Sequence, residues 1–176
     1  RAYAIALELV SHGDGRVDAE NLRGFVASYQ TITSLKLGEL WAIPTMLRLA
    51  LLESLRRIAV RIAVHRADRD AANLWAARLL DVAEREPRTL ALALADLVRE
   101  DPPLTGAFVA DFARRLRGEN PALTLPMHWL EQRLAETNQT IEQLVQLDGQ
   151  NQAADQVSMS NGIGSLRFLA AMDWRE

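Results

Sequence analysis

The sequence contains no cysteine, and aromatic residues make up only 6% of it. The lack of cysteine excludes a disulfide framework, a thiol nucleophile and a cysteine-ligated zinc site. Hydrophobic residues nevertheless reach 49% of the chain, with alanine and leucine prominent among them. Because both are strong helix formers, this composition favours an ordered helical protein and argues against intrinsic disorder.

Long hydrophobic runs and an excess of positive charge are also missing. The most apolar region, 40–52, is interrupted by Arg48 and is shorter than the roughly 20 residues that span a bilayer. No signal peptide opens the chain, so we expect it to be soluble. The net charge of −3 argues against nucleic acid as a partner. Residues 172–176 contain no glycine or proline, and we expect the last helix to continue in a longer parent protein.

Apolar residues recur at intervals of three and four along most of the chain, which predicts an all-α fold of about seven to nine helices without strands. Turns marked by proline or glycine separate the helices. We expect one compact helical accessory domain over 1–176, or two sub-bundles over 1–68 and 69–176. The expected helices cover 3–10, 18–29, 37 to about 68, 70–84, 87–100, 108–118, 126–134, 140–147 and 165–172.

Three boundaries in this pattern have more than one interpretation. Pro44 either begins the long helix or kinks it, because proline removes an amide donor and crowds the previous turn. Segment 149–155 either extends the helix that Thr140 caps or forms a loop. Segment 161–164 contains two glycines and is a candidate interruption before the last helix.

The segment from His12 to Asp18 resembles part of a calcium-binding EF-hand loop. If Gly15 takes the sixth position of such a loop, Val10 and Asn21 fall at the first and twelfth positions. Calcium needs an Asp and a bidentate Glu at those two positions. We therefore interpret the segment as a turn between helices, with Asp18 as the cap of the second one.

Asp68 and Asp70 have the Asp-x-Asp spacing with which many nucleotide-sugar transferases hold a metal and a diphosphate. That role requires a loop after a strand, and nothing resembling a strand precedes Asp68. We expect these two residues to end one helix and cap the next, because the helix dipole favours acids near an N-terminus.

The remaining candidates for catalysis or metal binding are weaker. The spacing of His12, His65 and His128 supports neither a metal site nor a catalytic triad. The Ser-x-Ser-Asn-Gly-Ile-Gly run, 158–164, resembles a phosphate loop but lacks the Gly-Lys-Ser/Thr ending and a preceding strand. A turn or a close helix crossing is the expected role of this run. We assign no catalytic, cofactor-binding or metal-binding residue to this chain.

Two groups of arginines make local basic stripes on predicted helices. The expected role is a solvated face, because positive charges are favourable near helix C-termini. Glu53 is also expected to pair with Arg57 four residues later. The functional alternative is contact with anionic lipid headgroups or an acidic protein surface. The two groups are Arg56, Arg57, Arg61, Arg66 and Arg69, and Arg114, Arg115 and Arg117.

Tryptophan side chains could stack on sugar rings, and the chain has four of them. Three of the four lie within apolar helical patterns, so we expect packing in a core. The four residues are Trp41, Trp75, Trp129 and Trp174.

Five separated blocks carry a resemblance to a known family. They are Gly-Glu-Leu-Trp-Ala-Ile-Pro-Thr-Met-Leu-Arg-Leu-Ala-Leu at 38–51, Trp-Leu-Glu-Gln-Arg-Leu at 129–134, Gln-Ala-Ala-Asp-Gln-Val-Ser at 152–158, Ser-Leu-Arg-Phe-Leu at 165–169 and Asp-Trp-Arg-Glu at 173–176. In this order they resemble the N-terminal region of cyclic β-1,2-glucan synthases. Lys36 departs from the pattern, since a capping Thr is expected there.

The resemblance implies a large enzyme of the bacterial inner membrane that makes cyclic β-1,2-glucan from UDP-glucose, with a divalent metal. It implies that the transferase motifs lie elsewhere and that this chain binds no cofactor of its own. We expect a non-catalytic scaffold on the cytoplasmic face, with the remainder of the parent polypeptide as its partner. A glucan-binding module is the alternative and would need exposed tryptophans lining a groove. An enzyme in its own right would need acids converging in a pocket.

Overall fold

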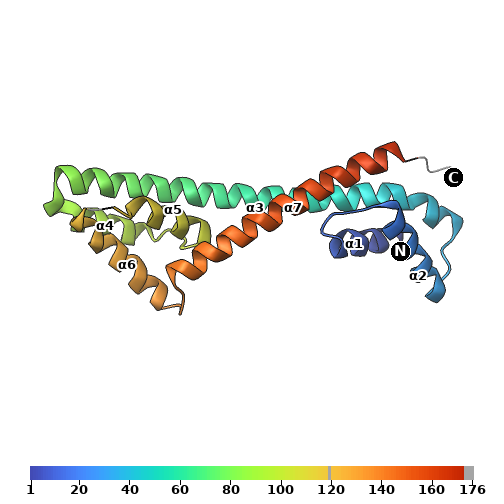
Figure 1. The fold of residues 1–176 in the computed structure, drawn as a ribbon, viewed down its shortest axis with the longest axis horizontal. Coiled ribbons are helices and arrows are strands. Elements are labelled where there is room, and N and C mark those ends of the chain that lie inside the picture. The colour runs from blue at the N-terminus through green and yellow to red at the C-terminus, as the bar shows by residue number, and fades with distance from the viewer. Residues whose placement is uncertain (119, 173–176) are drawn as a thin grey trace. The chain divides into compact units, whose positions relative to one another are not determined.

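The computed structural model describes residues 1–118 and 120–172 (Figure 1). The predicted all-α fold is confirmed, since the described residues form α-helices and short 3-10 helices without a strand. In chain order the elements are α1 (Ala2–His12), α2 (Ala19–Ile32), α3 (Leu37–Arg85), η1 (Pro87–Thr89), α4 (Leu90–Glu100), α5 (Gly106–Leu116), η2 (Pro121–Leu123), α6 (Thr124–Ala135) and α7 (Ile141–Ala171).

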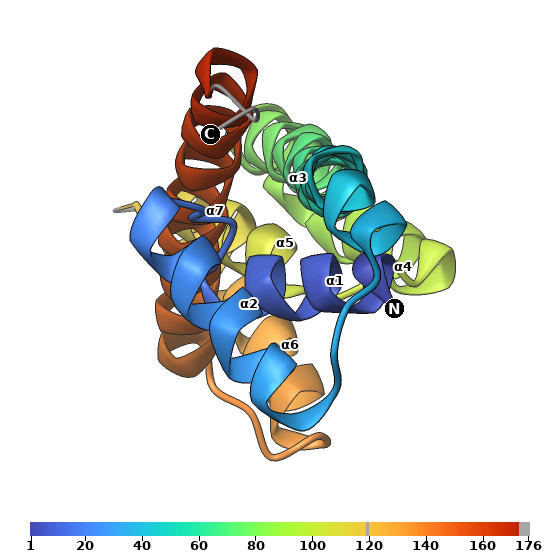
Figure 2. The ribbon, with the colours of Figure 1, turned by 90° about the vertical axis from the view of Figure 1, so that its right-hand side faces the viewer.

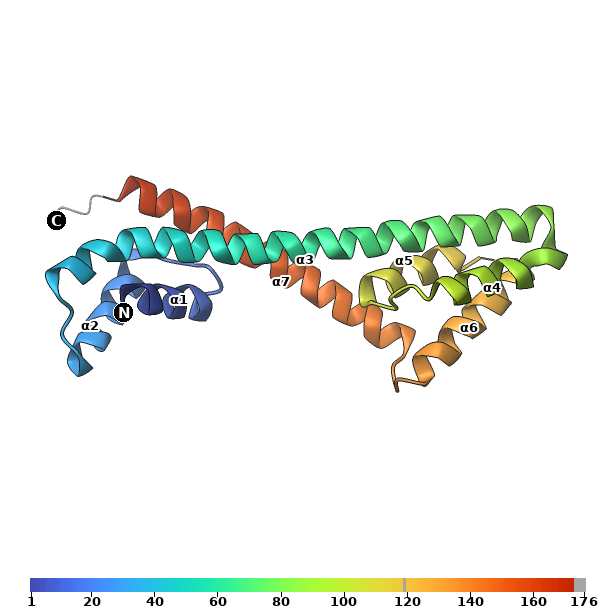
Figure 3. The ribbon, with the colours of Figure 1, turned by 180° about the vertical axis from the view of Figure 1, so that it is seen from behind.

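Helix α3 is a single helix of 49 residues, visible along its length in Figures 1 and 3. The prediction of two helices separated near residue 68 is therefore wrong. The carboxylate of Asp68 does not cap a helix but accepts a hydrogen bond from Thr105 Oγ1 at 2.8 Å. No glycine or proline interrupts 45–85, and strong helix formers dominate this stretch, so the helix continues. Pro44 lies inside α3 rather than at its start.

Helix α7 is also continuous, over 31 residues. Its start confirms the predicted capping box: Thr140 N–H donates to Gln143 Oε1 at 3.0 Å, and Gln143 N–H donates to Thr140 Oγ1 at 3.2 Å. Segment 149–155 extends the helix, and the candidate interruption at 161–164 does not occur. Both glycines of that segment are helical.

The chain forms two compact units, and α3 and α7 each contribute to both. Unit 1 contains residues 1–61 and 153–176, and unit 2 contains residues 62–152. The sub-bundles proposed from the sequence divide the chain once, whereas here the second half of α7 belongs with the N-terminal helices.

Unit 1 has a core of aliphatic side chains from α1, α2, α3 and α7. Figure 2 shows α1 and α2 beside the first part of α3 and the last part of α7. Leu47 and Leu51 of α3 and Leu169 of α7 are completely buried. Arg48, which interrupts the apolar run in the sequence, donates from Nη2 to Leu169 O at 2.8 Å. That bond satisfies a carbonyl group in the last turn of α7.

Unit 2 has a core that includes aromatic rings from α3, α5 and α6. Phe108 and Phe112 are completely buried, with ring centroids 5.4 Å apart. Trp129 meets Phe112 edge-on at a centroid distance of 6.4 Å. Such pairs add about 0.5–1.5 kcal/mol beyond the free energy of burial. The run 90–95, which alternates Leu and Ala as a strand would, begins α4, as predicted.

Candidate functional site

The segment that resembles an EF-hand loop is a structural turn held by α7. Ser165 is buried, accepts a hydrogen bond from Val17 N–H at 2.7 Å and donates one to Gly15 O at 2.7 Å. Asp18 caps α2, as predicted, by accepting from Asn21 N–H at 2.9 Å. The polar groups of this turn therefore fix the backbone between α1 and α2.

The glycines of the two motif-like runs meet each other in unit 1. Gly15 has a φ of +81°, and a Cβ on it would lie 3.1 Å from Ser158 O and 3.3 Å from Gly162 N. A Cβ on Gly162 would lie 3.0 Å from Leu55 Cδ2 of α3. Of the two roles predicted for 158–164, the close helix crossing is the one observed, and the run is not a loop.

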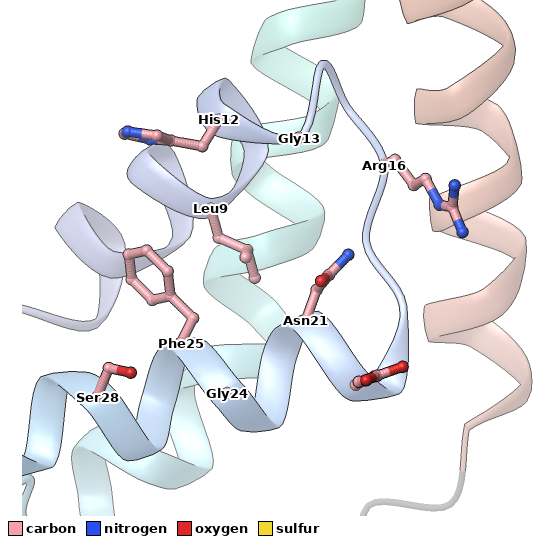
Figure 4. Close-up of a pocket in the computed structure, with 9 residues that line it drawn as sticks. Leu9, His12, Gly13, Arg16, Asn21, Gly24, Phe25 and Ser28 are labelled. Carbon is pink, nitrogen blue, oxygen red and sulfur yellow. The ribbon is translucent and has the colours of Figure 1, made fainter.

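An open pocket of about 520 Å³ lies between α1 and α2 (Figure 4). Phe25 rises from α2 toward α1 and Leu9 points from α1 toward α2, so these two side chains form its apolar part. Arg16 points away from Phe25, and its Nε lies 3.4 Å from Asp18 Oδ2. His12 Nδ1 is 2.9 Å from Glu8 O. Arg16 and His12 thus contact nearby groups of the chain instead of converging on one point.

A larger and more polar depression, of about 570 Å³, lies in unit 2, and we call it the polar groove. Asp148 of α7 is only 5% exposed and accepts hydrogen bonds from Arg69 Nη2 of α3 at 3.1 and 3.2 Å. Gln152 Nε2 donates to the same carboxylate at 2.6 Å. A Cβ on Gly106 of α5 would lie 3.2 Å from Asp148 Cβ, so α5 passes close to this point. Asp148 is therefore used to hold helices together.

The second carboxylate of the polar groove is also occupied. Asp111 of α5 accepts from Arg114 Nη2 at 2.6 Å and faces Asn73 Nδ2 of α3 at 3.5 Å. Neither carboxylate of the groove is left without a cationic partner. The groove can contact a polar molecule, but it offers no free carboxylate for proton transfer.

Unit 1 contains the same kind of bond between α3 and α7. Arg61 Nε donates to both carboxylate oxygens of the buried Asp155, at 3.0 and 3.1 Å. This hydrogen bond raises the pKa of Arg61 above its ordinary value. Sequence reasoning singled out neither Asp148 nor Asp155. The sequence does contain a signal for these pairs. Asp148 and Asp155 are seven residues apart on one helix, and Arg61 and Arg69 are eight residues apart on another.

The predicted basic stripe on α3 is partly neutralised by carboxylates. Arg61 and Arg69 bond to α7, and Arg56 and Arg57 both lie within 4.0 Å of Glu53. The hydrogen bond from Arg56 lowers the pKa of Glu53. Three carboxylates thus pair with four of the five arginines, which reduces the positive charge of the stripe.

The tryptophans do not share one environment. Trp75 is 5% exposed in the unit 2 core and carries Arg78 over its ring, with Cζ 5.0 Å from the centroid. Trp129 is half-buried against Phe112. Trp41 is 64% exposed, so the prediction that it packs in a core is wrong. Trp174 lies outside the described residues.

The described residues contain neither a metal-binding cluster nor a membrane-spanning helix. Within 1–118 and 120–172, no three His, Asp or Glu side chains form a group able to hold a metal ion. No helix in the described part of the chain combines the length and apolarity that crossing a bilayer requires.

Comparison with known proteins identifies one relative of clear similarity. No known protein family profile matches the chain. The chain is 31% identical, over 174 residues and 99% of its length, to the cyclic β-(1,2)-glucan synthase NdvB of Rhizobium meliloti (strain 1021). It spans only 6% of the length of that relative. The resemblance predicted from the sequence is confirmed, and the chain is homologous to a small segment of a cyclic glucan synthase.

Proposed function

We propose that this chain is a non-catalytic helical scaffold of an enzyme that makes cyclic β-1,2-glucan from UDP-glucose. It lies on the cytoplasmic side of the inner membrane and packs against the remainder of the parent polypeptide. The divalent metal and the transferase residues belong to other segments of that parent. The observation that carries the proposal is the engagement of the buried carboxylates in bonds between helices.

A catalytic acid, base or metal ligand must present a carboxylate to the substrate. Here Asp148 and Asp155 are buried and each binds an arginine of α3. Among the described residues, Asn73 Oδ1 is the single buried side-chain atom of nitrogen or oxygen that lacks a partner. This degree of internal satisfaction is typical of a structural core rather than of a site awaiting a ligand.

The homology supports the same division of labour. A segment that spans 6% of a synthase can be a supporting part without containing the reaction centre. The outer face of α3 in unit 1 supplies a surface for the parent, because Leu49, Leu52 and Val60 are each about half exposed on one side of the helix. Exposed apolar surface of this kind is typical of sites of protein association.

A glucan-holding module is the second candidate, and the exposure of Trp41 favours it, because sugar rings stack on exposed indoles. However, neither the α1–α2 pocket nor the polar groove is lined by a tryptophan. The scaffold explains the buried ion pairs, which a glucan module would not require.

Calorimetric titration of the chain with UDP-glucose plus Mg²⁺, and separately with cyclic β-1,2-glucan, tests the two candidates. The scaffold predicts no saturable heat with either compound. Saturable binding of glucan that is lost in Trp41→Ala and kept in Trp129→Phe would establish the glucan module instead. Saturable binding of UDP-glucose would contradict both.

A second test uses the parent enzyme. The paired replacement Arg69→Met with Asp148→Leu fills the polar groove with apolar side chains of similar volume, which often preserves stability. The scaffold predicts an unchanged yield of cyclic glucan per folded enzyme. A loss of product with unchanged enzyme abundance would mean that the polar groove takes part in the synthase reaction.

A further inference from the structure

The three most exposed large apolar side chains of unit 1 lie within ten residues of each other. Ile32 at the end of α2 is 87% exposed, Leu37 at the start of α3 is 72% exposed, and Trp41 one turn later is 64% exposed. Figure 1 shows the end of α2 and the start of α3 joined by one short connection at the same end of unit 1. We call these three residues, together with Lys36, the α2–α3 edge.

The exposure of the edge is fixed by the structure and does not result from a loose loop. Leu35, in the middle of the connection, is buried in the core of unit 1. Lys36 N–H donates to Glu39 Oε2 at 2.8 Å, which holds the start of α3 where a capping Thr was expected. With Leu35 turned inward and α3 starting at Leu37, the neighbouring apolar side chains are held in solvent.

Charge distinguishes the edge from the rest of the molecule. Segment 22–48 contains Arg23, Lys36, Arg48 and a single acid, Glu39, and so has a net charge of +2 within a chain of −3. The other residues together carry −5. Lys36 is the single lysine of the sequence. An apolar depression of about 310 Å³ between α2 and α3, lined by Leu22, Val26, Leu40 and Arg23 among others, adjoins the edge and contains no carboxylate.

We propose that the α2–α3 edge rests on the surface of an anionic phospholipid bilayer. Tryptophan prefers the level of the headgroups, leucine and isoleucine enter the boundary of the acyl chains, and a lysine places its ammonium among phosphates. The edge brings these groups together where the acidic chain is locally positive. The arginines of the α3 stripe are not part of this edge, and four of the five lie within 4.0 Å of a carboxylate.

This proposal goes beyond the scaffold function and does not depend on it, because it concerns the chain's own affinity for lipid. The contact is peripheral, with a few side chains in the interface. Binding of an isolated surface of this size is weak and reversible, and a tethered parent would increase its occupancy.

Flotation with vesicles of phosphatidylcholine, with and without phosphatidylglycerol, measures the binding directly. We expect the chain to float with the vesicles that contain phosphatidylglycerol and to be released by added salt. Trp41 should be quenched by lipids brominated on their acyl chains, and that quenching should disappear in Trp41→Phe. Trp75 is buried and Trp129 is half-buried, so the difference between the wild type and Trp41→Phe isolates the quenching of Trp41.

Matched variants distinguish binding through this edge from nonspecific adsorption through any exposed apolar side chain. Leu37→Ser should lower partitioning onto anionic vesicles roughly tenfold, because most of the favourable free energy of transferring the leucine side chain from water to the bilayer is lost. Leu92→Ser is the control, since Leu92 is 70% exposed but belongs to unit 2. Lys36→Gln should lower binding about fivefold on anionic vesicles and leave any binding to phosphatidylcholine unchanged.

Three outcomes would overturn the proposal. The first is an absence of flotation with any vesicle, while circular dichroism shows a folded helical chain. The second is equal partitioning of Leu37→Ser and Leu92→Ser. The third is concentration-dependent dimerisation in solution that Leu37→Ser abolishes without a lipid effect, which would assign the edge to a second copy of the chain.

Discussion

Unit 1 and unit 2 use the same ion pair between α3 and α7 but fill their interiors differently. In each unit an arginine of α3 binds a buried aspartate of α7, Arg61 with Asp155 and Arg69 with Asp148. Elsewhere in unit 1 the core is aliphatic, and Gly15 makes a close backbone contact with α7. The core of unit 2 contains stacked and edge-on aromatic rings.

This contrast separates two sources of specificity. A core of large rings loses stability when volume is removed, because a cavity remains. A contact between backbone segments loses stability when volume is added, because neither backbone can move aside. Removal of side-chain volume should therefore damage unit 2, and addition of side-chain volume should damage unit 1.

The largest effect is expected from Phe112→Ala in unit 2. Phe112 is completely buried between Phe108 and Trp129, so its removal should cost about 3–5 kcal/mol of unfolding free energy. Urea unfolding followed by tryptophan fluorescence measures it. Phe112→Leu, which keeps most of the volume, should cost clearly less, and equal losses for both variants would show that the rings are not packed as described.

The two ion pairs give the next largest effects. Asp148→Ala should cost about 2–4 kcal/mol, because it leaves Arg69 partly buried and removes the acceptor of Gln152. Asp155→Ala should cost about half as much, since the side chain of Arg61 is 51% exposed against 26% for Arg69, and water can replace its partner. Guanidinium denaturation of both variants measures the two costs. A larger loss of stability for Asp155→Ala than for Asp148→Ala would contradict the expected order of the two ion pairs.

A single methyl group tests the backbone contact of unit 1. Gly15→Ala should cost about 1–3 kcal/mol, because the residue has a positive φ and its Cβ would meet Ser158 O and Gly162 N. Gly164→Ala is the control, since no atom lies within 4 Å of its Cβ position in α7. That change should stabilise the helix by about 0.5–1 kcal/mol. Thermal unfolding compares them, and losses of similar size would show that the contact at Gly15 is unimportant.

The sequence predicts helices well here because propensity and periodicity agree over most of the chain. The alternating Leu-Ala run at 90–95 illustrates this, since both residues disfavour strands and the segment is helical. The capping residues Asp18 and Thr140 were found because a cap acts on amides only two or three residues away. Local interactions of this kind can be identified from a single sequence.

The failures have tertiary causes. Asp68 looked like a helix end, but its partner is Thr105, which lies 37 residues away in the chain. Gly162 looked like a breaker, but it admits Leu55 at a helix crossing. Trp41 looked buried because apolar residues surround it in the sequence, so periodicity could not tell which of them faces the core. Of the candidate sites, the sequence therefore revealed the turn and its cap but not the aspartates that bind α3.

The smallest effect concerns Glu53, on the solvent side of α3 in unit 1, and it separates exposed ion pairs from buried ones. The hydrogen bond from Arg56 lowers the pKa of Glu53 in the folded chain. The resulting stabilisation is fully present above the pKa of an unfolded glutamate and is lost as the pH falls through the lower folded value. The difference in melting temperature between the wild type and Glu53→Gln should therefore be small at neutral pH and disappear once the pH falls below the lowered pKa of Glu53 in the folded chain. Added salt should reduce this difference in melting temperature, because it screens exposed charges. Glu84→Gln, at an exposed position of α3, is the control for the loss of a surface charge. A difference for Glu53→Gln as large as that for Asp148→Ala would mean that burial does not set the strength of these pairs.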